Sequence, residues 1–220
     1  MKRLPTVRDL ILTTDHGTVF AAAVDSCGAI GMLPNDALAA KEEVVGLYTA
    51  RVPLLEVLAV GASPVCATVS VSNGPETAEG LLEGVRRALG VTVLGACEAG
   101  SLRVGGVRPG DILYCAGRPR VGGELLRPGT ELLAPRHIAA LLEDLHVRAA
   151  LPVGSRGVAA EARVLAEESG LRVRLSDSAG IELAKSAGPS ACAVFAARPG
   201  ADLSGLSIPV RAVGEFCRDA

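Results

Sequence analysis

Aromatic side chains are scarce in this chain, and that scarcity constrains its interior more than any other sequence feature. Two tyrosines and three phenylalanines are the only aromatic residues among 220, and there is no tryptophan, although 49% of the residues are hydrophobic. The core must therefore be built from close-packed alanine, valine and leucine. The apolar content excludes global disorder, and the lack of aromatic rings excludes a surface that stacks nucleic-acid bases.

Charge and cysteine content narrow the class of protein further. Twenty-two basic residues against 24 acidic ones leave a net charge of −2, without a basic patch of the kind that binds DNA or RNA. No apolar run reaches about 18 residues, so we expect no membrane span. Arg8, Asp9 and Asp15 interrupt the N-terminal apolar stretch, which argues against a signal peptide. The six cysteines form no Cys-x-x-Cys motif, and we expect reduced thiols in a cytoplasmic protein.

The pattern of apolar residues predicts strands that alternate with helices. Short apolar runs predict strands near residues 7–13, 18–24, 65–71, 91–95, 111–116, 171–175, 191–197 and 208–213. Helical periodicity predicts helices over 76–89, 135–146 and 156–169, and over 42–61 with a kink or break at Pro53. We therefore expect an α+β protein of two α/β lobes. Arg108-Pro109-Gly110 marks their boundary, giving domains 1–107 and 108–220.

The common catalytic and nucleotide-binding motifs are missing. The sequence contains no G-x-x-x-x-G-K-[ST], no G-x-G-x-x-G and no H-E-x-x-H. The stretch VGSRG at 153–157 is one residue short of a nucleophile elbow, and only three histidines are present to act as a base. Serine-hydrolase chemistry is therefore not expected.

Acidic residues and glycines instead gather in the first third of the chain. Carboxylates at strand ends suit Mg²⁺, and small residues beside them let backbone N–H groups approach phosphate oxygens. The alternative is a set of solvated turn residues. The residues concerned are Asp15, Asp25, Gly28, Gly31, Asn35, Asp36, Lys41 and Glu56.

The strings TTDHGTVFAAAVDS, EVLAVGASPVCATVSV and ETAEGLLEGVRRAL resemble the N-terminal domain of the aminoimidazole ribonucleotide synthetase superfamily, which includes thiamine-monophosphate kinase, selenophosphate synthetase and the hydrogenase maturation factor. Asp15 and Asp25 match its strand acids, Glu56 matches its helix acid, and Gly61-Ala62-Ser63-Pro64 matches its turn. The chain is most similar to alpha-ribazole kinase, a short member in cobalamin salvage. The supporting strings are VDSCGAIGMLPNDALAAKEEVVGLYTARVPLLEVLAVGASP, GDILYCAGRPRVGGELL, LPVGSRGVAAEA and AKSAGPSACAVF.

The resemblance implies an ATP- and Mg²⁺-dependent kinase that phosphorylates the 5′-hydroxyl of alpha-ribazole. It implies a homodimer whose N-terminal lobes share a β-barrel, and the apolar runs FAAAV and VCATVSV also require cover on both faces. Metal ligands would be Asp15, Asp25 and Glu56, with Asp25 and Lys41 as catalytic residues. Nucleotide or riboside contacts would come from Gly28, Gly31, Asn35, Asp36 and Arg51.

Each role has a simpler alternative, and one family feature is missing. Lys41 would be solvated beside Glu42 and Glu43, Asn35 and Asp36 would be turn residues, and Arg51 would form an exposed ion pair. The superfamily's glycine-rich acidic segment, expected after 76–89, has no room before the strand that follows, and Glu98 comes only later. Two further functions therefore stay open. One is another ATP-dependent superfamily enzyme, either activating an amide or acyl oxygen or resembling thiamine-phosphate kinase. The other is a nucleotide-binding module without turnover.

Overall fold

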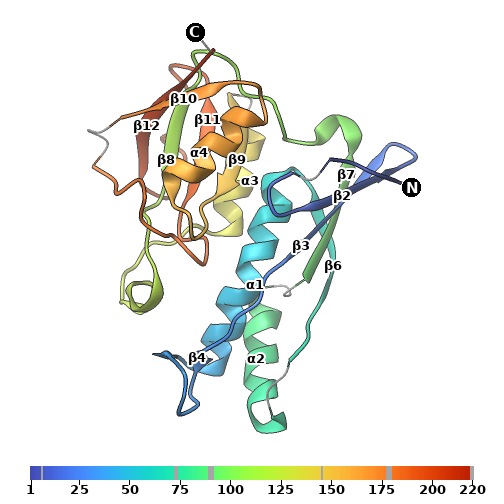
Figure 1. Ribbon diagram of the computed structural model, residues 1–220, viewed down its shortest axis with the longest axis vertical. Helices are drawn as coiled ribbons and strands as arrows, with labels where there is room; N and C mark the ends of the chain where they lie inside the picture. The colour runs from blue at the N-terminus through green and yellow to red at the C-terminus, as the bar shows by residue number, and fades with distance from the viewer. Residues whose placement is uncertain (6, 72–73, 89–91, 145, 177–179, 219–220) are drawn as a thin grey trace. The chain divides into compact units, whose positions relative to one another are not determined.

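Two compact units make up the chain (Figure 1). The computed structural model describes residues 1–5, 7–71, 74–88, 92–144, 146–176 and 180–218. The first unit comprises Met1–Leu58 and Ala62–Ser101, and the second comprises Ala59–Gly61 and Leu102–Ala220. Both combine helices with a five-stranded sheet, which confirms the expected α+β class. Among the described helices, none is long and apolar enough to cross a membrane.

The first unit is built on an antiparallel sheet in the order β1-β2-β3-β7-β6. Hairpin β2–β3 turns at His16 and Gly17, whose φ angles of 45° and 84° match the two-residue turns that follow the twist of a hairpin. Asp15 and Thr18 pair beside this turn. The strands are β1 (Lys2–Arg3), β2 (Ile11–Asp15), β3 (Thr18–Val24), β6 (Ser63–Thr68) and β7 (Thr92–Glu98).

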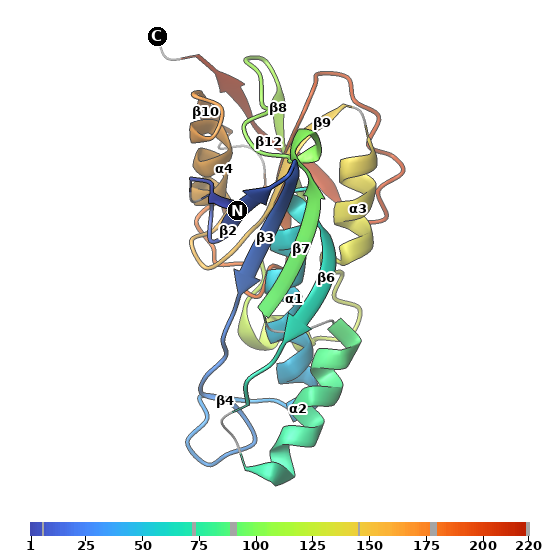
Figure 2. The same cartoon turned by 90° about the vertical axis from the view of Figure 1, so that its right-hand side faces the viewer.

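The two faces of this sheet differ in cover. In β3, Val19, Ala21 and Ala23 are buried, and helix α1 (Glu42–Ala59) runs behind these strands in Figure 2. On the opposite face of the same strand, Phe20 and Val24 remain exposed. The open face is nevertheless apolar, as the runs FAAAV and VCATVSV suggested.

Helix α1 continues through Pro53 as one helix, so the break expected there is wrong. Proline removes one backbone hydrogen bond, but Pro53, Leu54 and Leu55 are all buried, and their packing outweighs that loss. Helix α2 (Pro75–Ala88) crosses the first half of α1 at two glycines. A Cβ atom on Gly46 would collide with the Leu81 carbonyl, and one on Gly84 would collide with the Glu43 carbonyl.

The second unit is a separate antiparallel sheet in the order β10-β12-β8-β11-β9. Helix α4 packs on β9, β10 and β11, while α3 packs on β9. Strand β11 is buried along its whole length, and Phe195 within it stacks on Tyr114 of β8. The elements are β8 (Ile112–Ala116), α3 (Pro135–Glu143), β9 (Val147–Pro152), α4 (Val158–Glu167), β10 (Arg172–Leu175), β11 (Ala193–Ala197) and β12 (Val210–Cys217), with short helices η1 (Ala99–Ser101) and η2 (Gly122–Leu126).

Candidate functional site

The chain leaves β3 at Asp25, and this carboxylate is only partly accessible to solvent. Burial raises its pKa, and a hydrogen bond from the Ser26 backbone opposes that rise. A partly desolvated carboxylate favours a cation or a proton beside it. Asp25, among the carboxylates that the sequence singled out, therefore has an environment that suits a neighbouring cation.

Cys27 links Asp25 to helix α1 and to the loop that follows. Burial raises the pKa of the Cys27 thiol, and the negative charges of Asp25 and Asp36 raise it further. A hydrogen bond with Thr49 of α1 acts in the opposite direction. Because both carboxylates act on the same thiol, Asp25 and Asp36 lie in one neighbourhood, against the first half of α1.

Residues 29–40 form a compact loop around two short parallel strands, β4 (Ile30–Gly31) and β5 (Leu38–Ala39). The Leu33 backbone donates a hydrogen bond to Asp36 Oδ2 at 2.8 Å, and the Asp36 backbone donates to the Leu33 carbonyl at 3.1 Å. A Cβ on Gly31 would lie 2.7 Å from Asp36 Oδ2. Asp36 and Gly31 therefore hold the turn together, and the exposed Asn35 lies at its tip.

The two cationic candidates lie at the start of α1 and within it. Lys41 is exposed directly before the helix, and its carbonyl accepts hydrogen bonds from the backbones of Val44 and Val45. The Arg51 guanidinium lies 5.8 Å from the ring centroid of Tyr48. Burial raises the pKa of Tyr48, and the charge of Arg51 opposes this. Arg51 is therefore partly buried, not exposed as the sequence alternative assumed, and its guanidinium contacts an aromatic ring.

The strand register separates Asp15 from Asp25. Asp15 pairs with Thr18 at the hairpin turn, whereas Asp25 follows the far end of β3. Asp25 lies seven positions after Thr18, so the backbones of Asp15 and Asp25 lie about 23 Å apart along β3. Thr18 also pairs with Glu98 of β7, which places Glu98 at the Asp15 end.

Glu56 lies further along α1. Its side chain is half-buried, and its Oε2 atom is shielded from solvent. Seven residues separate it from Thr49, which is about 10 Å along a helix axis. Within the described ranges, no three His, Cys, Asp or Glu side chains converge as a metal site. Asp15, Asp25 and Glu56 therefore do not come together within one chain. The expectation placed Asp15 and Asp25 at strand ends, but β2 and β3 are antiparallel, so these ends lie at opposite edges of the sheet.

Two other expectations have different outcomes. A Cβ on Gly28 would meet no atom within 4 Å, so its surroundings are open enough for a ligand to approach the backbone. The position expected for the missing acidic segment falls on residues 89–91, which lie outside the described residues.

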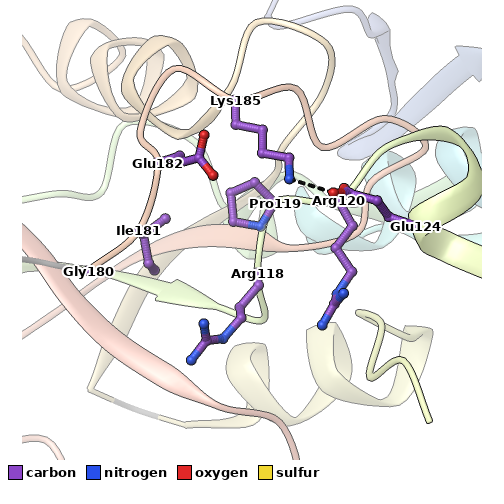
Figure 3. A pocket seen from close by; sticks show the side chains of 8 residues that line it. All are labelled: Arg118, Pro119, Arg120, Glu124, Gly180, Ile181, Glu182 and Lys185. Carbon is purple, nitrogen blue, oxygen red and sulfur yellow. Dashed lines mark hydrogen bonds and ion pairs between the residues drawn. The ribbon is translucent and has the colours of Figure 1, made fainter. Parts of the chain in front are cut away.

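Sequence reasoning missed a cavity of about 230 Å³ in the second unit (Figure 3). Three basic side chains, Arg118, Arg120 and Lys185, share its lining with Glu124 and Glu182. The only sequence signal was the string GRPR, which places two arginines around a proline directly after a strand.

No protein-family model and no curated protein matches the chain. Solved structures match nearly all of it. Thiamine monophosphate kinase from Aquifex aeolicus matches with a TM-score of 0.66 and 18% identity, covering 98% of this chain and 90% of that chain. Hydrogenase maturation protein HypE in complex with ATP matches with a TM-score of 0.65 and 13% identity, covering 98% of this chain and 80% of that chain. Phosphoribosylformylglycinamidine synthase II from Thermotoga maritima matches with a TM-score of 0.61 and 16% identity, covering 96% of this chain and 42% of that chain.

These likenesses define the fold. The chain has the aminoimidazole ribonucleotide synthetase-like fold that its sequence resemblance implied. The agreement extends over both units, because each of these structures is matched by at least 96% of the chain.

Proposed function

We propose that this protein is an ATP-dependent phosphotransferase that acts on a hydroxyl group of a small molecule, with the 5′-hydroxyl of alpha-ribazole as the expected acceptor. The observation that carries the proposal is the fold likeness over 96–98% of the chain to proteins solved with ATP or the ATP analogue AMPPCP. The sequence strings shared with alpha-ribazole kinase support the choice of acceptor. We expect the enzyme to be cytoplasmic.

A partly buried carboxylate at the end of β3 supports the proposal of a magnesium site there. Burial raises the pKa of Asp25, and a divalent cation beside this carboxylate offsets that cost. Asp25 is the central ligand in the proposal, and Asp36, whose charge acts on the same Cys27 thiol, adds negative charge to this neighbourhood. A bound Mg²⁺ would offset the charge of the phosphate oxygens, so that a hydroxyl could approach the phosphorus atom. The roles of Asp15 and Glu56 as metal ligands stay predictions, because within one chain both residues lie away from the end of β3 that carries Asp25.

The remaining groups position the substrates. Lys41 is exposed directly before α1, and in the proposal its ammonium group contacts phosphate oxygens. Backbone N–H groups around Gly28 and Gly31 contact phosphate or ribose, with Asn35 at the exposed tip of the same loop. In this mechanism the protein contributes position and charge rather than a covalent intermediate.

A second function is favoured by a specific observation. One matching structure is a thiamine-monophosphate kinase complexed with AMPPCP and TMP, at 16% identity, so an acceptor that already carries phosphate is the strongest alternative. The two other alternative functions are activation of an amide or acyl oxygen and nucleotide binding without turnover. The comparisons support the general class of ATP-dependent enzyme better than the ribazole acceptor.

We also propose a homodimer formed through the open face of the first unit's sheet. Ile11, Phe20, Val24 and Leu94 leave 36–65% of their surface exposed there. At the edge of the same sheet every residue of β6 is exposed. A second copy covers this apolar surface in the shared-barrel arrangement that the sequence resemblance implies.

The test incubates the purified protein with ATP and Mg²⁺ and one acceptor at a time: alpha-ribazole, thiamine monophosphate, or none. Release of ADP with a new phosphate ester on alpha-ribazole supports the ribazole kinase. ADP and product only with thiamine monophosphate supports the alternative. Saturable ATP binding without any product supports the non-catalytic module, and absence of ATP binding overturns the class.

A further inference from the structure

The cavity in the second unit is assembled from two separate segments. Strand β8 ends at Ala116, and the Gly117 backbone donates a hydrogen bond to the Pro209 carbonyl at 2.8 Å, turning the chain toward Arg118. The opposite wall is formed by residues 180–185. Figure 3 shows Arg118 and Arg120 projecting on either side of Pro119.

One wall of the cavity is already neutralised. Lys185 Nζ donates a hydrogen bond to Glu124 Oε1 at 2.9 Å, and this bond lowers the pKa of Glu124. The Val121 backbone donates to the other oxygen of Glu124 at 3.1 Å. The pair therefore fixes the wall of the pocket without using either arginine.

The two arginines keep their charge available. In the part of the chain that the structure describes, neither Arg118 nor Arg120 forms an ion pair, and Arg120 Nε is shielded from solvent without a hydrogen-bond acceptor. A shielded donor without an acceptor is costly, so a ligand oxygen that meets it binds favourably. Arg211 adds positive charge at the rim, because a Cβ on Gly180 would lie 3.5 Å from its Nη1 atom.

We propose that this pocket binds the phosphate group of a small phosphate monoester. Planar guanidinium groups pair with phosphate through two parallel hydrogen bonds. Beyond the Lys185–Glu124 pair, the lining carries two positive charges, on Arg118 and Arg120, against one negative charge on Glu182. The cavity of about 230 Å³ is smaller than the roughly 300–1,000 Å³ usual for drug-sized ligands, which fits a phosphate with a small organic group. The proposal rests on the second unit alone and stands apart from the ATP-dependent activity.

The test is calorimetric titration of the full chain with ribose 5-phosphate, inorganic phosphate and ribose. Ribose 5-phosphate is expected to bind and ribose is not. Titration with inorganic phosphate shows whether the organic group contributes to binding. Equal affinity for phosphate and ribose 5-phosphate means that the pocket contacts only the phosphate group, and tighter binding of ribose 5-phosphate means that it also contacts the organic group.

Four variants locate the binding. Arg120→Gln and Arg118→Gln should each weaken ribose 5-phosphate binding at least about tenfold, since each removes a charge-assisted pair. Glu182→Gln should strengthen it severalfold. Arg163→Gln, an exposed arginine of α4, should change affinity less than twofold. Arg118 is exposed, so Arg118→Gln should fold normally. It therefore tests the proposal even if Arg120→Gln fails to fold. No binding to the natural chain, or equal losses in Arg163→Gln and Arg118→Gln, would overturn the proposal.

Discussion

At the scale of single residues, Asp25 combines partial burial with a place beside an open glycine loop. The fold leaves its carboxylate poorly solvated, and the pKa of Asp25 rises for that reason. Residues kept in costly environments often serve function rather than stability. Asp36 differs from it, because its carboxylate is committed to the Leu33 backbone.

We predict that Asp25→Asn lowers Mg²⁺-dependent turnover by about two orders of magnitude or more, since it removes the central anionic ligand. The measurement is ADP release at saturating ATP, with circular dichroism to confirm the fold. Glu167→Gln, an exposed carboxylate on α4, is the matched control and should retain full turnover. Normal turnover in a folded Asp25→Asn protein would remove Asp25 from the site.

The same substitution should increase stability at neutral pH. A carboxyl whose pKa is raised in the folded state is more readily ionised after unfolding, so its charge favours the unfolded chain above both pKa values. The stability advantage of Asp25→Asn over the natural chain should therefore shrink as the pH falls through the folded pKa toward about 4. Urea unfolding at pH 7 and at pH 4 measures it, and a constant difference contradicts the assignment.

At the scale of elements, the crossing of α1 and α2 depends on glycine. Glycine normally weakens a helix by about 1 kcal/mol relative to alanine. Here Gly46 and Gly84 let two helix backbones approach, because a side chain at either position would meet a carbonyl of the other helix.

We predict that Gly84→Ala destabilises the protein by about 1–3 kcal/mol, despite the better helix propensity of alanine, because the added methyl group overpacks the crossing. Gly100→Ala is the control: its Cβ would meet nothing within 4 Å, and we expect a change below about 0.5 kcal/mol. Denaturant unfolding compares the two. Equal or greater stability of Gly84→Ala would show that the helices can separate without cost.

Sequence periodicity predicted most elements but missed β9. Val147–Pro152 reads VRAALP and is buried at nearly every position, so it shows no alternation that distinguishes a strand from a buried helix. The site was harder to predict. Asp15 and Asp25 both end predicted strands, but only the hairpin register shows that these ends point in opposite directions. The pocket around Arg120 brings together residues far apart in the sequence, which no local pattern reveals.

At the scale of the whole molecule, the open apolar face of the first unit is the feature that calls for a partner. Phe20 and Leu94 lie on neighbouring strands, since the register pairs Ala22 with Leu94 and Phe20 with Ala96. Exposed apolar side chains gathered on one sheet face are typical of an interaction surface.

We predict that Phe20→Asp and Leu94→Asp each convert the proposed homodimer into monomers, because a carboxylate buried at the interface lacks a partner. Sedimentation velocity at micromolar concentration measures the change. Leu126→Asp, which replaces an exposed leucine of the second unit, should leave the dimer intact. A natural chain that sediments only as a monomer removes the shared-barrel arrangement.

The strand order of the first unit also determines when its sheet can close during synthesis. Val24 of β3 pairs with Thr92 of β7, although α1, β6 and α2 all come between them in the chain. The β2–β3 hairpin forms from local contacts, but its neighbour does not exist until β7 leaves the ribosome, several seconds later at about 5–20 residues per second. During that interval Val19, Phe20 and Ala21 are paired with β2 on one edge of β3 but have no strand on the edge that β7 later occupies. Nascent chains stalled before β7 should therefore recruit chaperones, and those extended past Glu98 should release them.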